Sequence, residues 1–205
     1  MRFVGIFLAF LFMSNQLSGN VLKFHTKDGL LNKFTRYYLM DREKRLWVAT
    51  FGNGIRVFNG KTWKVYTTGS TKDTRYNKQG LLNDHILAMA MDYTNSYLWV
   101  ITTDGLCRMN LKTEGWEHFN GDKKPPVDFV RDVAVDDNGN AFFATYAGVA
   151  EYTIAGKWKM HTVKDGLYDE NIRLVRFAEG SIWAGSRAGA VCRLDGKRWV
   201  TYIDY

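Results

Sequence analysis

The sequence predicts an all-β protein built from four antiparallel sheets, because one pattern of strands and turns recurs four times along its 205 residues. In each copy an apolar strand with an aromatic residue is followed by a turn, a second strand, and a third strand that begins with tryptophan. The first aromatic position holds Trp47, Trp99, Phe142 and Trp183, and the second holds Trp63, Trp116, Trp158 and Trp199. All seven tryptophans fall on these two positions, and such self-similarity decides the fold.

A further strand precedes the first aromatic residue of every copy and completes a unit of four strands. These strands are expected at Thr35–Met40, Ile86–Met91, Val130–Val135 and Ile172–Phe177. Four strands in a unit of roughly 40 residues are typical of a β-propeller blade, whereas an α-solenoid would show a 3.6-residue period and helix caps. The predicted blades span about residues 33–68, 84–120, 128–163 and 170–205.

The first copy, Leu46–Tyr66, illustrates the local assignment. LWVAT is rich in strand-forming residues, Gly52-Asn53-Gly54 is a turn, and IRVF is the next strand. Asn59-Gly60 predicts a two-residue hairpin turn, because both residues tolerate positive φ. A hairpin of two or three strands cannot bury a tryptophan alone, so the units must pack against one another.

Each copy also fits a longer pattern, which reads DGL, a short loop, V-x-x-I-x-x-D, and then L-W-I-G-T-x-x-G-L-x-R-Y-D. The matching segments are Asp28-Gly29-Leu30, Gly80-Leu81, Asp165-Gly166-Leu167, LWVAT, LWVIT and Gly105-Leu106-Cys107-Arg108. Over about residues 24–205 the chain therefore resembles the two-component regulator propeller repeat family. The third copy departs from the pattern, because it lacks DGL and carries Phe142 in place of tryptophan.

This resemblance implies a function as well as a fold. Members of the family form the extracytoplasmic sensor portion of hybrid two-component systems, which detect oligosaccharides and pass the signal to further domains. The family usually closes its ring with more than four blades, commonly seven, so the resemblance implies a four-repeat partial copy. The alternatives are a protein-interaction scaffold propeller at the cell envelope and a non-functional fragment of a longer sensor.

The N-terminus predicts export. Residues 1–19 contain Arg2, the apolar run Phe3–Met13 and a small-residue end at Leu17-Ser18-Gly19, which together resemble a secretory signal. The run is too short to span a membrane, which takes about 20 residues; the alternative is a buried N-terminal strand. We therefore expect the repeats to occupy residues 20–205 of a periplasmic or secreted protein with no membrane span after signal removal.

The charge and the cysteines exclude several classes. The net charge of +7 comes from scattered basic residues, which suit solvated faces or an acidic ligand and predict no nucleic-acid partner. Cys107 and Cys192 share one repeat position in blades that are two apart. Their Cα atoms should therefore be further apart than the roughly 6 Å that a disulfide allows, so both cysteines should be free and buried. No CxxC or Cys/His cluster occurs, and no metal or cofactor is expected. The stretch Asp136–Asn140 resembles a calcium loop but lacks its last glutamate, and a turn is predicted there.

The sequence predicts a protein that is not an enzyme. It contains no G-x-S-x-G, H-E-x-x-H or G-x-G-x-x-G motif. His25, His118 and His161 fall on outer strands, where structural roles are expected. An enzymatic alternative is a propeller lyase, for which His85 beside Asp84 would be the available pair.

The predicted ligand site lies at the mouth of the propeller. One position near the start of each inner strand holds Arg36, Leu87, Arg131 and Arg173. The full set of predicted ligand-binding residues is Arg36, Phe51, His85, Asp104, Arg131, Tyr146, Arg173 and Arg187. Arginines with aromatic rings around a concave mouth suit a carboxylate or a sugar, so we expect an oligosaccharide or an anionic small ligand. The alternative is that each arginine pairs with an acid of the next blade. The polar insertion Thr67–Gln79 enters the second copy and is either functional or simply tolerated.

The four copies are predicted to form an open propeller. Leu22–Thr26 resembles an outer strand, since Phe24-His25-Thr26 matches Met160-His161-Thr162. The last copy already has its own outer strand at Trp199–Ile203, so the N-terminal strand is left over. An open arc exposes apolar faces and strand edges, which predicts self-association or missing blades supplied by another chain.

Overall fold

The computed structural model describes residues 35–68 and 80–203, which form four antiparallel sheets of four strands each. The predicted signal peptide, residues 1–19, the predicted strand Leu22–Thr26 and most of the insertion Thr67–Gln79 lie outside the described residues. The class predicted from the sequence, an all-β protein of propeller blades, is confirmed.

Each sheet is one blade, and its strands pair in chain order. Blade 1 consists of β1 (Thr35–Met40), β2 (Leu46–Thr50), β3 (Ile55–Phe58) and β4 (Trp63–Tyr66). Blade 2 consists of β5 (Ile86–Asp92), β6 (Tyr97–Thr102), β7 (Gly105–Asn110) and β8 (Trp116–His118). Blade 3 consists of β9 (Val130–Val135), β10 (Ala141–Thr145), β11 (Gly148–Tyr152) and β12 (Trp158–His161). Blade 4 consists of β13 (Ile172–Ala178), β14 (Ser181–Ser186), β15 (Val191–Asp195) and β16 (Arg198–Tyr202).

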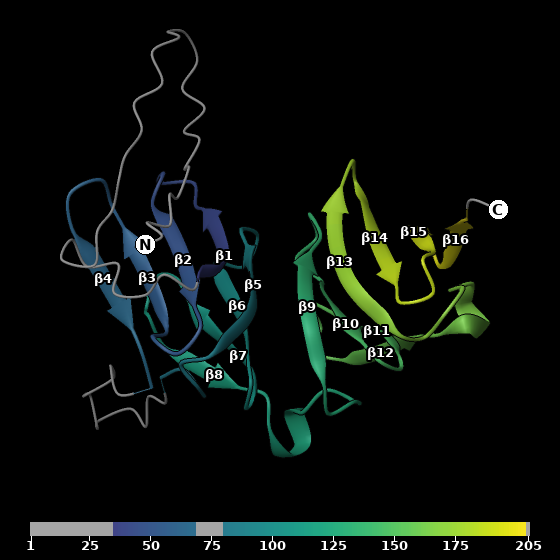
Figure 1. The fold of residues 1–205 in the computed structure, drawn as a ribbon, viewed down its shortest axis with the longest axis horizontal. Coiled ribbons are helices and arrows are strands. Elements are labelled where there is room, and N and C mark those ends of the chain that lie inside the picture. The colour runs from purple at the N-terminus through teal and green to yellow at the C-terminus, as the bar shows by residue number, and fades with distance from the viewer. Residues whose placement is uncertain (1–34, 69–79, 204–205) are drawn as a thin grey trace, which may run out of the picture.

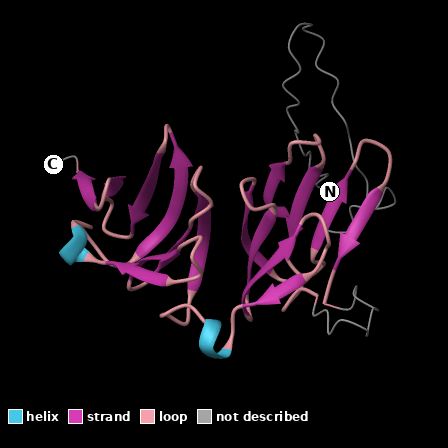
Figure 2. Ribbon diagram, turned by 180° about the vertical axis from the view of Figure 1, so that it is seen from behind, coloured by secondary structure: helices cyan, strands magenta, loops and turns pink. Residues whose placement is uncertain are grey.

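The inner strand of every blade is its first. Blades 1 and 2 form one half of the molecule and blades 3 and 4 the other, with β5 and β9 facing each other in the middle (Figure 1). Two short 3₁₀ helices, η3 (Gly121–Lys123) and η4 (Val163–Asp165), lie in the connections to blades 3 and 4 (Figure 2). None of the helices in the described part of the chain is long and apolar enough to cross a membrane.

Three apolar clusters join the blades in sequence. The first lies between blades 1 and 2 around Trp47 and Met89, the second between blades 2 and 3 around Trp99 and Phe143, and the third between blades 3 and 4. We call the face of a blade that packs on the following blade its forward face and the opposite face its backward face. The described residues form no cluster between the forward face of blade 4 and the backward face of blade 1, which is the arrangement of an open propeller.

The two tryptophan positions serve opposite faces. On each forward face the first aromatic residue packs against a ring at the end of the outer strand of the same blade. These pairs are Trp47–Tyr66 (5.9 Å between ring centroids), Trp99–Phe119 (4.9 Å), Phe142–His161 (6.2 Å) and Trp183–Tyr202 (5.7 Å). The second tryptophan of the following blade then contacts that ring. These contacts are Tyr66–Trp116 (6.2 Å), Phe119–Trp158 (6.1 Å) and His161–Trp199 (5.8 Å). One tryptophan per repeat therefore packs on the next blade and the other on the preceding blade.

The acid that follows an inner strand shapes the turn into the next strand. Asp136 accepts hydrogen bonds from the backbone of Asn138 (3.0 Å) and Asn140 (2.8 Å), which confirms a turn at this place. Asp41 does the same for its own turn and also accepts from Trp47 Nε1 at 2.8 Å. Burial alone would raise the pKa of Asp41, but the hydrogen bonds from Trp47 and Arg45 outweigh it and lower the pKa.

One predicted turn was wrong. Asn59-Gly60 does not form a two-residue hairpin, because β3 ends at Phe58 and β4 begins at Trp63, which leaves four residues between them. The Asn59 side chain accepts hydrogen bonds from the backbone N–H of Lys61 and of Thr62, both at 2.9 Å. This asparagine-centred turn competes with the tight hairpin, and register pairing of Phe58 with Trp63 favours it.

The cysteines and two of the histidines are structural, as predicted. Cys107 and Cys192 are free and buried in different clusters, and burial raises the pKa of the Cys107 thiol to about 12. His161 is 1% exposed, and its Nε2 lies 2.8 Å from Glu151, whose pKa this hydrogen bond lowers. His118 Nε2 lies 2.7 Å from the carbonyl oxygen of Gly80. The third histidine of that prediction, His25, lies outside the described residues.

Candidate functional site

The candidate site lies at the end of the blades where the inner strands begin, which we call the rim. Because neighbouring strands are antiparallel, the turns between the second and third strands lie at this same end. Three of these turns are held alike, since the hydroxyls of Thr50, Thr102 and Thr145 donate to carbonyl oxygens at 2.8, 3.0 and 2.7 Å. Gly148 is required in one of them, because its φ is +112° and a Cβ there would lie 2.0 Å from the carbonyl oxygen of His161.

A β-bulge occupies the same place in all four inner strands. Thr35 pairs with Thr50 and Tyr37 with Ala49, so Arg36 is an extra residue in β1. The equivalent extra residues are Leu87, Arg131 and Arg173. A bulge redirects its side chain relative to the regular alternation of the strand, and bulges are frequent beside binding sites. The sequence placed these four residues at one repeat position, and the bulge is the local structure that the sequence analysis missed.

The predicted residues of blades 1 and 2 come together. The Arg36 guanidinium lies over the Phe51 ring at 5.2 Å, and the Phe51 and His85 rings are 4.4 Å apart, edge to face. His85 Nδ1 lies 2.8 Å from Asn83 Oδ1, and Asn83 Nδ2 donates to Asp104 Oδ2 at 2.9 Å. Asn83, which the sequence analysis did not select, therefore links His85 to Asp104.

The predicted arginines of blades 3 and 4 form a second group. Arg131 Nη1 donates to Asn171 Oδ1 at 2.6 Å and to the carbonyl oxygen of Ile172 at 3.1 Å, so Arg131 ties β9 to the start of β13. Burial, followed by the positive charges of Arg173 and Arg187, lowers the pKa of Arg131. Three guanidiniums therefore share one region, and none of them forms an ion pair with a carboxylate of the described residues. Two of them, Arg173 and Arg187, are exposed to solvent.

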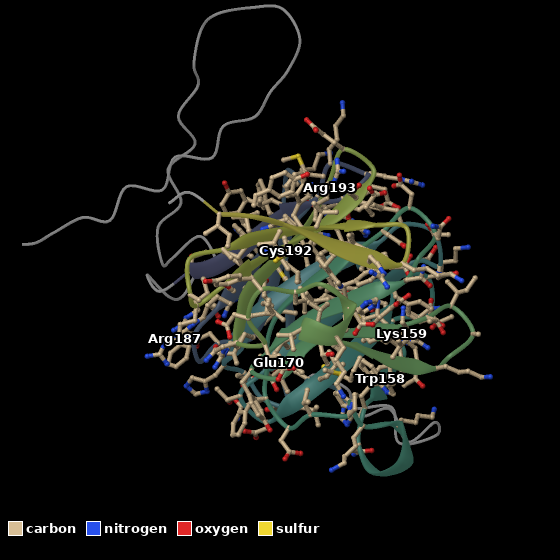
Figure 3. All side chains as sticks on the ribbon, turned by 90° about the vertical axis from the view of Figure 1, so that its right-hand side faces the viewer. Trp158, Lys159, Glu170, Arg187, Cys192 and Arg193 are labelled. Atoms are coloured by element: carbon tan, nitrogen blue, oxygen red, sulfur yellow. The ribbon has the colours of Figure 1, made fainter. Side chains whose placement is uncertain are left out.

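Arg187 projects from the same side of the molecule as Glu170, well away from Arg193 (Figure 3). The last predicted residue, Tyr146, lies in the turn between β10 and β11 and is 47% exposed. The structure thus divides the eight predicted residues into a group at blades 1 and 2, a group at blades 3 and 4, and Tyr146 between them in the chain.

A hollow of about 310 Å³ opens at the rim between blades 2 and 3. Its apolar lining includes Leu87, Leu106, Phe119 and Phe129, and its polar lining includes Thr103, Asp104, Lys124 and Asp128. Phe129 is 70% exposed, so its ring is accessible to solvent at the edge of this hollow. Of the predicted residues, Asp104 lines this hollow directly.

The hollow lies where the third repeat departs from the others. Leu81 and Leu167, the leucines of two DGL segments, stand five residues before Ile86 and Ile172 and are buried between blades. Five residues before Val130 the chain carries Pro125 instead, and Pro125 lines the hollow. A proline ring is smaller than a leucine side chain, and the hollow lies at this position. The missing DGL was visible in the sequence, and it is the signal that could have located this hollow.

A network near the propeller axis was not predicted. Tyr37 Oη donates to Asp132 Oδ1 at 2.7 Å, Arg176 forms an ion pair with Asp132, and the Arg176 guanidinium lies over the Tyr37 ring at 5.6 Å. Burial raises the pKa of Tyr37, and the hydrogen bond to Asp132 acts in the same direction. These three residues come from β1, β9 and β13, so no local sequence pattern could have connected them.

The pair considered for lyase chemistry is engaged elsewhere. Asp84 Oδ1 accepts a hydrogen bond from the backbone of Thr68 at 2.8 Å, while His85 Nδ1 is held by Asn83. Among residues 35–68 and 80–203, the side chain that holds the His85 ring is thus the amide of Asn83 and not the carboxylate of Asp84.

Comparison with known proteins identifies the fold. No protein-family model and no curated protein matches the chain. The extracellular domain of the two-component-system protein BT4673 from B. thetaiotaomicron is similar, with a TM-score of 0.61 and 18% identity over 84% of this chain and 22% of that domain. A streptogramin B lyase has a TM-score of 0.61 to this chain, with 12% sequence identity; the match covers 82% of this chain and 54% of the lyase. Virginiamycin B lyase from Staphylococcus aureus, in a catalytically inactive form with quinupristin, has a TM-score of 0.65 and 10% sequence identity. This match covers 85% of this chain and 58% of that lyase. The chain thus spans about a fifth of the first protein and little more than half of the lyases.

Proposed function

We propose that the chain is the ligand-binding part of an extracytoplasmic sensor propeller, and that its rim takes an oligosaccharide. The observation that carries the proposal is the hollow beside Pro125, which stands where the two other described repeat entries have the inter-blade leucines Leu81 and Leu167. Similarity in fold to the extracellular BT4673 domain supports the class, and the signal-like residues 1–19 support the location.

The lining of the hollow suits a sugar. Phe119 and Phe129 offer ring faces for the apolar side of a pyranose, and Thr103 and Asp104 offer hydrogen-bond partners for its hydroxyls. The exposed guanidiniums of Arg173 and Arg187 suit a carboxylate or sulfate group, because bidentate hydrogen bonds to such groups are strong. An acidic oligosaccharide would use both features, and an anionic small ligand would use the arginines alone.

Thermal-shift and calorimetric titrations with neutral and acidic oligosaccharides test the proposal. Pro125→Leu should fill the hollow and weaken binding of both kinds at least tenfold. Arg173→Ala combined with Arg187→Ala should weaken only the acidic ligands. Arg198→Ala is the matched control, because Arg198 is an exposed arginine at the opposite end of blade 4.

The arginine test avoids Arg131, because its hydrogen bonds to Asn171 and Ile172 make it a tie between blades. If no oligosaccharide or anionic ligand shifts the melting temperature, or if Pro125→Leu binds as well as the original protein, the rim is not a ligand site.

A further inference from the structure

A second hollow lies between blades 2 and 3, at the end of the blades opposite to the rim. We call this end the base and the cavity the base hollow; its volume is about 250 Å³. Strand β5 ends here at Asp92 and β9 ends here at Val135. The lining includes Tyr97, Arg108, Gly139, Tyr152, Ile154 and Gly156. The base hollow shares no lining residue with the hollow at the rim, so it is a separate cavity.

The turns around the base hollow are tied together. Thr94 Oγ1, in the turn after β5, donates a hydrogen bond to the carbonyl oxygen of Asp137, in the turn after β9, at 3.0 Å. Asn95 Nδ2 donates to Asp92 Oδ2 at 3.0 Å and packs so closely on Gly139 that a Cβ there would lie 2.1 Å from this nitrogen. The two blades are therefore fixed relative to each other at the base, and the hollow is formed before any ligand arrives.

Arg108 is the residue of the base hollow that can hold an anion. Its guanidinium lies over the Tyr97 ring at 4.2 Å and 5.6 Å from the Tyr152 ring of the next blade. Its Nε donates to Glu117 Oε2 at 2.7 Å, and within the described ranges the guanidinium makes no other hydrogen bond. A guanidinium carries five N–H donors, so the four on Nη1 and Nη2 remain available in a side chain that is only 18% exposed.

The charge beside the base hollow is positive. Glu117 accepts hydrogen bonds from both Arg108 and Lys123, each at 2.7 Å, so one negative charge faces two positive charges. Arg108 is the one charged residue among those that line the base hollow. Asp92 and Asp136, the acids of the two flanking turns, accept hydrogen bonds from the backbone of their own turns. The electrostatic potential at Nη1 and Nη2 therefore favours an anion.

The shape of the site favours a carboxylate on a flat ligand. The Nη1–Nη2 edge of a guanidinium can donate two parallel hydrogen bonds to the two oxygens of one carboxylate. Tyr97 and Tyr152 line the hollow, and neither hydroxyl forms a hydrogen bond with another described residue. Their rings give apolar walls for the body of a ligand. Since one water occupies about 30 Å³ of the liquid, the base hollow has room for a small organic molecule.

We propose that the base hollow binds a small organic carboxylate that carries a ring. The carboxylate accepts hydrogen bonds from Nη1 and Nη2 of Arg108, and the ring lies beside Tyr97 and Tyr152. The site belongs to the interface between blades 2 and 3, and a ligand in it contacts both blades. The proposal does not depend on the ligand at the rim.

Calorimetric titration of the full chain with benzoate tests the proposal, with benzamide as the neutral molecule of the same shape and inorganic sulfate as a tetrahedral anion. Every protein compared carries Arg173→Ala and Arg187→Ala, so the rim arginines do not contribute. Benzoate should bind, and benzamide and sulfate should bind at least about tenfold more weakly. Arg108→Lys, which keeps the charge and removes the two-nitrogen edge, should weaken benzoate binding about tenfold or more.

Ile154 supplies a matched pair of variants that leaves the interface intact, because this side chain lines the base hollow and is 68% exposed. Ile154→Glu places a negative charge at the hollow and should weaken benzoate binding about tenfold or more, whereas Ile154→Gln should not. Circular dichroism confirms that each variant is folded; if Arg108→Lys is not, the Ile154 pair decides. Absence of benzoate binding, equal binding of benzamide, tighter binding of sulfate, or equal benzoate affinity of the two Ile154 variants would overturn the proposal.

Discussion

Replacing Trp99 by alanine tests the blade-to-blade packing directly. Trp99 is 1% exposed and joins blades 2 and 3, since its ring lies 4.9 Å from Phe119, 5.3 Å from Phe143 and 5.6 Å from Tyr152. Because the three rings come from both blades, the cavity left by alanine would open inside the interface and could not be filled by one blade alone. We therefore expect a large loss of folding free energy.

The magnitude follows from two opposing terms. Removing a buried tryptophan costs about 3–5 kcal/mol, which includes the cavity that remains. The buried Nε1 of Trp99 finds no hydrogen-bond partner in the described part of the chain, however, and an unsatisfied buried donor costs about 1–3 kcal/mol that the alanine variant no longer carries. The expected loss is therefore about 3 kcal/mol, at the lower end of the range.

Urea unfolding followed by far-ultraviolet circular dichroism measures this loss. Trp183→Ala is the matched control, because Trp183 holds the same repeat position on a face of blade 4 that no other described blade covers. It is only partly buried there and should cost less folding free energy than Trp99→Ala. Trp99→Phe, which copies the natural Phe142 of blade 3, should cost less than Trp99→Ala. A Trp99→Ala loss below about 1 kcal/mol, or one no larger than that of Trp183→Ala, would refute the assignment of the interface.

Three further outcomes are expected. The folded-state pKa values of Asp41 and Glu151 are lowered, so their stabilisation is present above about pH 4 and is lost as the pH falls through the folded-state values. Urea unfolding from pH 7 to pH 3 should show this loss, and Asp41→Asn should flatten the pH dependence; an unchanged slope would contradict it. Gly148→Ala should lower the melting temperature by several degrees, because the added Cβ would meet the His161 carbonyl oxygen. Gly60→Ala should lower the melting temperature less, because a Cβ at that position would have no atom within 4 Å. The Cys107 thiol, with its pKa near 12, should resist alkylation at pH 8 in the folded protein and react on unfolding; rapid labelling under native conditions would show that its interface opens.

The repeat made most of the fold predictable. The inner strands expected at Thr35–Met40 and Val130–Val135 form with those bounds, and those in blades 2 and 4 extend by one residue to Asp92 and Ala178. The spacing of the tryptophans located the blades because each blade needs one large ring for each of its two faces. The hairpin at Asn59 failed because a side chain formed hydrogen bonds with the turn backbone, which a pattern of residue types does not report.

The site was less predictable than the fold. The repeat position of Arg36, Arg131 and Arg173 was visible, but the bulge that redirects these side chains depends on pairing between strands. The axial contact of Tyr37 with Asp132 joins residues 95 apart in the chain, and only the curvature of the whole arc brings them together. Local periodicity carries no information of that kind.

The departures from the repeat are more informative about function than the repeat itself. A regular blade needs leucine before its inner strand to seal the interface, and Leu81 and Leu167 meet that need. A chain that places Pro125 there and keeps an exposed Phe129 four residues later forgoes about 0.8 kcal/mol for each methylene group that stays unburied. Stability alone does not favour such a gap. The same reasoning applies to Arg131, whose pKa is lowered by burial and then by the charges of Arg173 and Arg187, a repulsion that an anion among the three guanidiniums would relieve. The rim of blades 2 to 4 is therefore where ligand binding would offset energetic costs that folding leaves in place.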